Sequence, residues 1–290
     1  MLVSGFTFIR NAIKYDYPIL EAIQSVLPLV DEFVLALGNS DDGTGDMIRQ
    51  KAQSDKLRIL DTVWDETLRQ GGRVLAVETD KALAAVNPES TWCIYIQGDE
   101  CLHEKDHEHI KAAMQKWKDN KEVEALWFDW LHFCGTYDYV ADSFSRYRRE
   151  VRIIRNGLGI SSWKDAQGFR KNGEKLQAKP ANAQVYHYGM VKPPNLQQDR
   201  LKYFHSLWHD EHKVKEMMGS EAEFDYNSLD KLFRFAGSHP QYIQELISRL
   251  NWQLTNDPTQ NPVKLKIKLK MLTEKLFGIR LGEYKGFMGI

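Results

Sequence analysis

Short apolar runs alternate with amphipathic stretches along the first hundred residues of this chain. Four of these runs have the length of a buried strand: 2–9, 32–37, 57–62 and 91–96. Leu20, Ile23 and Leu27 recur at helical spacing after the first run, and helices are also predicted over 47–54 and 74–86. Strands that alternate with helices indicate β-α units. The pattern therefore predicts an α/β fold with a Rossmann-like, mostly parallel central sheet and helices on both faces.

The pattern is less regular beyond residue 100. Further strands are predicted over 124–133, 150–156 and 183–189, and a glycine-rich, loop-rich stretch lies before the last of them. Helices are predicted over 201–218, 228–237 and 240–254. We expect one domain over 1–195, with halves of about 1–100 and 101–195, followed by a helical C-terminal extension over 196–290.

Composition narrows the setting in which the protein works. A formal net charge of -1 and a pI near 6.8 give no basic field for nucleic acid. Three cysteines without a C-x-x-C spacing indicate a reduced, intracellular protein. No stretch approaches the roughly 18 apolar residues of a membrane span, and the N-terminus lacks the basic leader of a signal peptide. A cytoplasmic location is therefore expected.

Polar residues follow the buried strands where chemistry is expected. Ligands of open parallel sheets bind beyond the carboxyl ends of the strands, which here means the loops 10–12, 38–44 and 97–100. Gln97 and Asp99 project to one side of an extended chain, and a carboxylate held there suits a hard divalent cation. The alternative is that Asp99 merely begins the next helix, where it would favour the helix dipole.

Two longer segments carry a family resemblance. The segment "FIRNAIKYDYPILEAIQSVLPLVDEFVLALGNSDDGT" has a strand, an R-N pair, a helix that ends in S-V-L-P, then V-D-E and an S-x-D-G-T loop. "STWCIYIQGDE" has a buried strand that ends in an acidic motif. In order and spacing these features resemble a family 2 glycosyltransferase of the GT-A fold. The resemblance covers the first hundred residues and is weaker from 135 onwards, although "VYHYG" before "KPP" is again similar.

The chain departs from the family pattern at two positions. Gln97 stands where the family's metal motif begins with an aspartate, and a glutamine offers only a neutral amide oxygen. Leu37 stands where the family commonly has the acid that reads the nucleotide base. Because that acid is absent, UDP is only the default nucleotide of the donor.

The resemblance implies transfer of a sugar from a nucleotide-diphosphate sugar to a hydroxyl, with inversion at the anomeric carbon. It also implies a divalent cation, Mn²⁺ or Mg²⁺, on the diphosphate. Asp99 is then the first metal ligand, and His187 in "VYHYG" is the second by similarity. Its neighbours Tyr186 and Tyr188 are equally typical of core packing, so a structural role for His187 remains the alternative.

The acceptor hydroxyl needs a carboxylate as general base on the face of the sugar opposite the leaving group. Asp165 in "SSWKDAQGF" lies where the resemblance places that base, and Glu100 beside the metal motif competes for the role. A solvated loop aspartate is the alternative for Asp165. The resemblance further implies nucleotide-sugar contacts from Arg10, Asn11, Asp41, Asp42, Arg73, Asp80, Gln97 and Lys192.

The acceptor is expected to be a saccharide or a lipid-linked saccharide. Residues 263–270 alternate lysine with apolar residues, as in an exposed strand or a basic surface drawn to anionic lipid. A peripheral contact with the inner face of the membrane is therefore a further hypothesis. The sequence leaves the oligomeric state open.

Other classes of protein compete with this interpretation. His103, Glu104 and His107 spell H-E-x-x-H, the motif of zinc hydrolases, but charged residues fill both intervening positions and predict an exposed helix start. A nucleotidyltransferase would share the sheet and the acidic site, yet "FIRNAIKYD" lacks a Gly-rich basic loop. Gln97 in place of an acid also leaves open a non-catalytic nucleotide-sugar-binding protein.

Overall fold

Each apolar run of the first hundred residues forms a strand of one central sheet. The structure is a computed structural model that describes residues 1–68, 70–141, 147–219, 221–226, 229, 232–261, 265–277, 280 and 282–290. Within these residues the sheet has 11 strands: β1 (Val3–Ile9), β2 (Glu32–Gly38), β3 (Leu57–Thr62), β4 (Trp92–Tyr95), β5 (Glu100–Leu102), β6 (Ala125–Cys134), β7 (Tyr139–Ala141), β8 (Arg149–Arg155), β12 (Gln177–Met190), β13 (Leu232–Arg234) and β14 (Met288–Gly289). The helices are α1 (Ile19–Val26), α2 (Thr44–Lys51), α3 (Arg73–Ala84), α4 (His107–Trp117), α5 (Pro194–Ser206), α6 (Glu211–Met218), α7 (Gln244–Ser248) and α8 (Leu265–Phe277).

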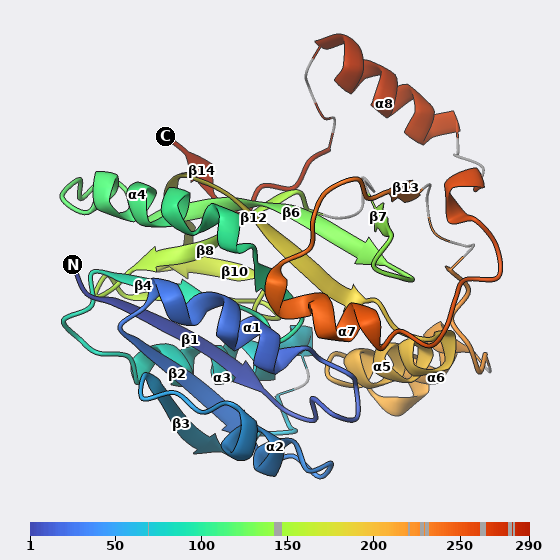
Figure 1. Ribbon diagram of the computed structural model, residues 1–290, viewed down its shortest axis with the longest axis horizontal. Coiled ribbons are helices and arrows are strands. Elements are labelled where there is room, and N and C mark those ends of the chain that lie inside the picture. The colour runs from blue at the N-terminus through green and yellow to red at the C-terminus, as the bar shows by residue number, and fades with distance from the viewer. Residues whose placement is uncertain are drawn as a thin grey trace.

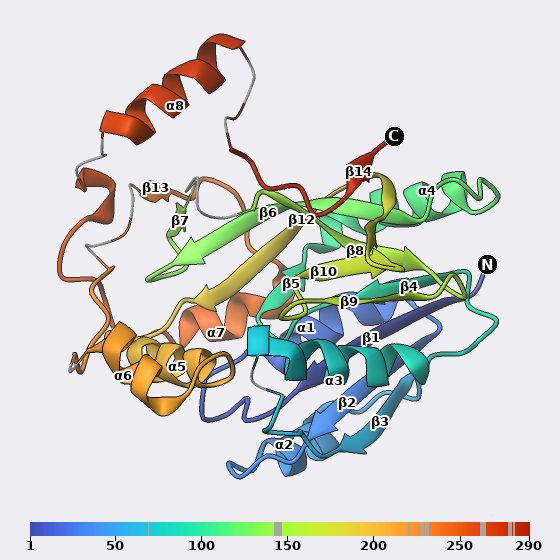
Figure 2. The same cartoon turned by 180° about the vertical axis from the view of Figure 1, so that it is seen from behind.

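The sheet is parallel in its N-terminal part and mixed beyond it. Its main path runs β13-β7-β6-β8-β4-β1-β2-β3, and β1, β2, β3 and β4 pair in parallel. Strand β8 then pairs antiparallel with both β4 and β6, while β12 runs parallel to β6. Helices lie on both faces: α1 and α4 are in front in Figure 1, and α3 is in front in Figure 2. The predicted α/β fold is confirmed.

Alternate residues of the central strands build two hydrophobic cores. In β2, Phe33, Leu35 and Leu37 pack with the buried side of α1. Val34 and Ala36 point the other way and pack with α3. Because successive side chains of a strand point to opposite faces, a strand covered by helices on both sides is apolar throughout. This double packing fixes the register of β1, β2 and β4, and with it the loops at their carboxyl ends.

Two expectations for the irregular parts were wrong. The stretch expected as loops forms a small three-stranded sheet, β9 (Ile160–Trp163), β10 (Gly168–Lys171) and β11 (Glu174–Lys175). Asn172 and Gly173, at φ angles of 52° and 84°, supply the two left-handed residues of the tight β10-β11 turn. In place of the helix expected over 228–237, residues 232–234 form β13, which pairs with β7 at the edge of the sheet, whereas 228, 230 and 231 lie outside the described residues. In each case pairing with a neighbouring strand overrides the local spacing.

The lysine-rich tail is helical rather than extended. Residues 265–277 form α8, whereas 263 and 264 lie outside the described residues. After α8 the chain returns to the central sheet, where β14 pairs with β12. Residue 195 lies in the first turn of α5, and the division of the chain into domains stays a prediction. None of the helices in the described part of the chain combines the length and apolar character that crossing a membrane requires.

Candidate functional site

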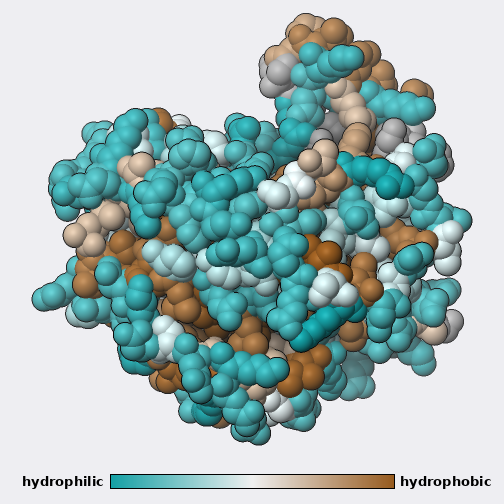
Figure 3. Space-filling model, viewed as in Figure 1, coloured by the Kyte–Doolittle hydropathy of each residue, from teal (hydrophilic) through white to brown (hydrophobic). Residues whose placement is uncertain are grey.

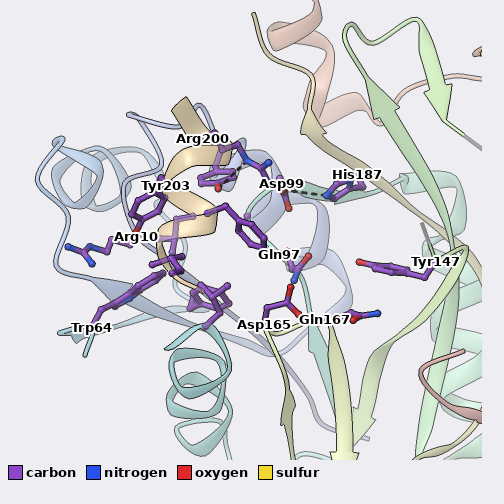
Figure 4. Close-up of a pocket in the computed structure, with 17 residues that line it drawn as sticks. Arg10, Trp64, Gln97, Asp99, Tyr147, Asp165, Gln167, His187, Arg200 and Tyr203 are labelled. Carbon is purple, nitrogen blue, oxygen red and sulfur yellow. Dashed lines mark hydrogen bonds and ion pairs between the residues drawn. The ribbon is translucent and has the colours of Figure 1, made fainter. Parts of the chain in front are cut away.

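A cavity of about 400 Å³ opens at the carboxyl ends of β1, β3 and β4 (Figure 4). This is the edge at which parallel sheets bind ligands, and the volume lies in the usual range of small-molecule sites. The β9-β10 turn, β12 and α5 contribute further wall, and so do Tyr17 before α1, Leu75 of α3 and Tyr147 before β8. Its lining residues are Phe8, Ile9, Arg10, Tyr17, Trp64, Leu75, Gln97, Gly98, Asp99, Tyr147, Asp165, Gln167, His187, Arg200, Tyr203, Phe204 and Leu207.

Asp99 lies at the centre of a charged cluster in this cavity. Its Oδ2 is 3.5 Å from His187 Nε2 and 3.3 Å from Arg200 Nη2, and Figure 4 shows the carboxylate between these two side chains. Burial alone would raise the pKa of Asp99, but His187, Arg200 and Lys192 together hold that pKa well below its ordinary value. Asp99 therefore stays ionised and can bind a cation throughout the neutral range.

The donor atoms at Asp99 fit a divalent cation that is shared with a diphosphate. One carboxylate and one imidazole face the same space, and Mg²⁺ and Mn²⁺ sites commonly add only one or two protein groups to substrate phosphates. Gly189 keeps that space open, because a Cβ there would lie 2.4 Å from Asp99 Oδ2 and 2.9 Å from His187 Nε2. Within the described residues, no three His, Cys, Asp or Glu side chains are grouped to hold a metal without such a substrate.

A second histidine orients His187. His132 Nε2 lies 2.8 Å from the carbonyl oxygen of Tyr147, and because a carbonyl only accepts, this nitrogen carries the proton. In the neutral imidazole the other nitrogen, Nδ1, then accepts from His187 Nδ1 at 3.3 Å. Nε2, on the side of Asp99, is then the nitrogen of His187 that pairs with the carboxylate and that would bind a cation after giving up its proton. Such outer hydrogen bonds fix the tautomer of metal-binding histidines.

We expect His132→Phe to weaken Mn²⁺ binding by about 10- to 100-fold, because the ring that fixes the His187 tautomer loses its nitrogens. Calorimetric titration of Mn²⁺ in the presence of a nucleoside diphosphate measures this directly. His109→Phe, at an exposed position of α4, is the matched control and should bind Mn²⁺ as the wild type does. Unchanged Mn²⁺ affinity in a folded His132→Phe protein would show that His132 does not orient His187 for the metal.

Asp165 faces the cavity from a tight turn between β9 and β10. Its neighbours Lys164 and Ala166 have positive φ angles of 56° and 63°, which non-glycine residues rarely adopt. The turn is tied to the strand end, because Gln97 Nε2 donates to the carbonyl oxygen of Ala166 at 3.0 Å. Gly72 lets α3 approach closely, since a Cβ there would lie 2.9 Å from that of Asp165.

Burial raises the pKa of the Asp165 carboxyl, and the nearby Lys164 charge only partly offsets this effect. A carboxylate with a raised pKa accepts a proton more readily, which suits a general base.

Glu100 is committed to an ion pair beneath the cavity. Its two carboxylate oxygens accept from Nε and Nη2 of Arg152, both at 2.8 Å, and neither side chain exposes more than 1% of its surface. Glu100 also accepts from the backbone N–H of Gln97 at 3.0 Å, and Arg152 donates to the carbonyl oxygen of Gln167. The pair therefore joins the two loops that carry Asp99 and Asp165. This geometry favours Asp165 over Glu100 as the base.

We expect Glu100→Gln to lower the free energy of unfolding by about 3–5 kcal/mol, because it leaves the Arg152 charge buried without its counter-ion. Urea unfolding followed by fluorescence measures the change. Glu108→Gln, whose side chain is 83% exposed, is the control and should shift stability by less than about 0.5 kcal/mol. Full stability of Glu100→Gln combined with lost turnover would instead assign Glu100 to the chemistry.

The residues expected to grip the donor fall into two groups. Arg10 lines the cavity, with Nη2 3.0 Å from Glu66 Oε1 and its guanidinium over the ring of Trp64. Gln97 lines it as well. Lys192 is buried beside it, donates to the carbonyl oxygen of Asp16 at 2.5 Å, and has its pKa lowered to about 8 by burial and by Arg200.

The other expected donor residues lie outside the lining of this cavity. Asn11 Oδ1 accepts from the backbone N–H of Asp41, and Asp42 accepts from those of Lys14 and Thr44, so these side chains tie the loops after β1 and β2 together. Arg73 is exposed at the first turn of α3. The carboxylate of Asp80 accepts from the backbone N–H of Ser162 at 2.7 Å.

The sequence interpretation missed the wall that α5 contributes. Arg200, Tyr203, Phe204 and Leu207 all line the cavity, and they follow the i, i+3, i+4, i+7 spacing of one helix face. That spacing is a signal in the sequence, but it predicts a packed face without indicating what the face covers. Trp64 and Tyr147 have no comparable sequence signal.

The H-E-x-x-H segment forms no zinc site. His103 precedes a 3-10 turn over Glu104–Asp106, and α4 begins only at His107, so the two histidines do not share a helix face. His103 Nε2 pairs with Ser238 Oγ at 2.9 Å and His107 Nε2 with the carbonyl oxygen of Ser25 at 3.0 Å. The expectation of an exposed helix start was wrong, because both histidines are buried against neighbouring elements.

No protein-family model and no curated protein matches the sequence. Among solved structures, S. aureus TarS is similar with a TM-score of 0.40 and 14% identity, over 70% of this chain and 39% of TarS. TarS 1-349 in complex with UDP has a TM-score of 0.42 and 11% identity, over 75% of this chain and 70% of TarS 1-349. A third similar structure is glucosyl-3-phosphoglycerate synthase from Mycobacterium tuberculosis in complex with Mn²⁺, UDP and phosphoglyceric acid. It has a TM-score of 0.29 and 17% identity, over 45% of this chain and 43% of the synthase. At these scores the function has to be argued from the chain's own residues.

Proposed function

We propose that this protein is a metal-dependent, inverting glycosyltransferase of the hexosyltransferase type, with a family 2 GT-A architecture. It would move a sugar from a nucleotide-diphosphate sugar to a hydroxyl acceptor. The observation that carries the proposal is the pairing of two carboxylates in one cavity. Asp99 is held ionised among cationic groups, whereas Asp165 has a raised pKa. Environments that separate two carboxyl groups in this way suit one for charge stabilisation and the other for proton transfer.

In the proposed reaction, Asp165 accepts the proton of the acceptor hydroxyl as its oxygen attacks the anomeric carbon. The bond from that carbon to the diphosphate breaks, and its electron pair leaves with the diphosphate. Arg200 and Lys192 place positive charge beside Asp99, where the leaving group gains negative charge. A divalent cation held by Asp99 and His187 would supply further positive charge to the diphosphate when bound.

Gln97 has a different role from the aspartate that begins the family's metal motif at this position. Its amide already donates to the Ala166 carbonyl oxygen, so it holds the turn that presents Asp165. A neutral residue there removes one acid from the cation site. The same observation favours the second candidate function, a GT-A protein that binds a nucleotide-sugar without transferring it.

The partners follow from the same proposal. A UDP-sugar is the default donor, and the acceptor is a saccharide or a lipid-linked saccharide of the kind used in cell-surface polysaccharide synthesis. The protein would act in the cytoplasm, with a peripheral contact at the inner face of the membrane.

A panel of nucleotide-sugars tests the proposal. Thermal shift with Mn²⁺ identifies the donor that stabilises the protein, and nucleotide release then reports transfer or hydrolysis. Release of a nucleoside diphosphate is the expected result. Stabilisation without release would favour the binding protein. Release of pyrophosphate from a nucleoside triphosphate and a sugar phosphate would favour a nucleotidyltransferase. No binding of any nucleotide-sugar would contradict both the glycosyltransferase and the nucleotide-sugar-binding protein.

A further inference from the structure

Four leucines form an exposed stripe along helix α8. Leu265, Leu269, Leu272 and Leu276, which we call the leucine stripe, have 74%, 56%, 50% and 64% of their surfaces exposed. Their spacing of four, three and four residues places them on one side of the helix. Figure 1 shows α8 projecting from the body of the protein, and Figure 3 shows apolar side chains gathered on this projection. Four neighbouring exposed leucines on one helix mark an interaction surface.

Ion pairs on the opposite side set the direction in which the stripe faces. Glu274, about half a turn around the helix from the leucines, pairs with Arg148, which precedes β8. It also pairs with Arg280 at 3.2 Å, and the side chain of Arg280 is only 4% exposed. These contacts hold the Glu274 side of α8 toward the protein, so the leucine stripe faces outward.

Lysines accompany the stripe. The 13 residues of α8 include four lysines and a single glutamate, although the whole chain has a formal net charge of -1. Lys268 and Lys275 are exposed and lie at the border of the leucine stripe. An apolar helix face bordered by lysines is the arrangement that lies in the interface of an anionic membrane.

We infer that α8 docks the protein on an anionic membrane surface through the leucine stripe. The inference rests on the peripheral contact included in the proposed function, but it does not depend on catalysis. Charge selects this occupant over a second copy of the helix, because pairing two such faces would bring lysine borders of like sign together. The helix would lie flat, with its leucines among the acyl chains and its lysines among the anionic headgroups.

Co-sedimentation with vesicles tests the inference. Vesicles of phosphatidylcholine with phosphatidylglycerol should bind the wild-type protein at low salt, and pure phosphatidylcholine vesicles should bind it at least about tenfold more weakly. Leu269→Gln combined with Leu272→Gln, and separately Lys268→Gln combined with Lys275→Gln, should each weaken binding by about tenfold or more. Lys213→Gln combined with Lys215→Gln on α6 is the matched control and should bind as the wild type does.

Two outcomes would overturn the inference. One is wild-type protein that stays in the supernatant with the anionic vesicles. The other is a wild-type dimer in solution that the leucine variants convert to a monomer, because the stripe would then be covered by a second copy. Thermal shift with the nucleotide-sugar is measured on the same variants, so that loss of docking is distinguished from failure of the proposed donor site.

Discussion

Asp99→Asn is expected to lower turnover of the nucleotide-sugar by about 10²- to 10³-fold while the protein stays folded. The substitution removes the charge on which His187, Arg200 and Lys192 converge. It leaves three cationic or proton-donating groups around a neutral amide and weakens the hold on a divalent cation. The expected loss is in kcat, because the missing charge acts where the diphosphate departs.

Release of the nucleoside diphosphate at saturating donor and Mn²⁺ measures this loss, and circular dichroism confirms the fold. Asp119→Asn makes the same chemical change at a side chain that is 90% exposed, and it should leave turnover unchanged. Wild-type turnover by Asp99→Asn would leave the reaction class standing but remove Asp99 from the site.

Asp165→Asn is expected to lower kcat by about 10²- to 10⁴-fold with little change in donor affinity. The amide cannot accept the proton of the acceptor hydroxyl, whereas the turn that Gln97 ties to the strand end is kept. Because the carboxyl titrates at a raised pKa, the wild-type rate should fall as the pH is lowered through that pKa and Asp165 becomes protonated.

Steady-state kinetics against both substrates, together with the pH profile of kcat, test the role of Asp165. Asp55→Asn, at an exposed position before β3, is the control and should keep the wild-type rate and profile. An Asp165→Asn protein that retains kcat, or that loses it only through a higher donor KM, would assign the proton transfer elsewhere.

The sheet was predictable because its central strands are buried on both faces. In β2, Phe33 and Leu35 pack in one core and Val34 in the other, so the strand is an unbroken apolar run. Such a run is typical of a strand that is covered on both faces. The small sheet of β9, β10 and β11 could not be predicted in the same way. Its strands are short and partly exposed, and its glycines are as typical of loops as of tight strand connections.

The site was predictable where it lies on the chain next to a buried strand. Asp99 lies four residues after the end of β4, and the family resemblance pointed to His187. Arg200 contacts the same carboxylate from 101 residues away, and only the packing of α5 brings the two together. Asn11 and Asp42 lie in segments that resemble the family motif, but their side chains accept hydrogen bonds from the backbone of neighbouring loops and do not line the cavity. Local sequence identifies residues at strand ends, whereas contacts between distant segments require the folded chain.

The continuity of α5 across residue 195 affects how the chain can be divided. His187 on β12 and Arg200 on α5 both contact Asp99, and only thirteen positions separate them, so one uninterrupted segment supplies both. A chain cut after residue 195 would keep the doubly covered strands but lose Arg200, Tyr203 and the pairing of β14 with β12. Exchanging the last third of the chain would therefore also replace part of the wall of the cavity around Asp99.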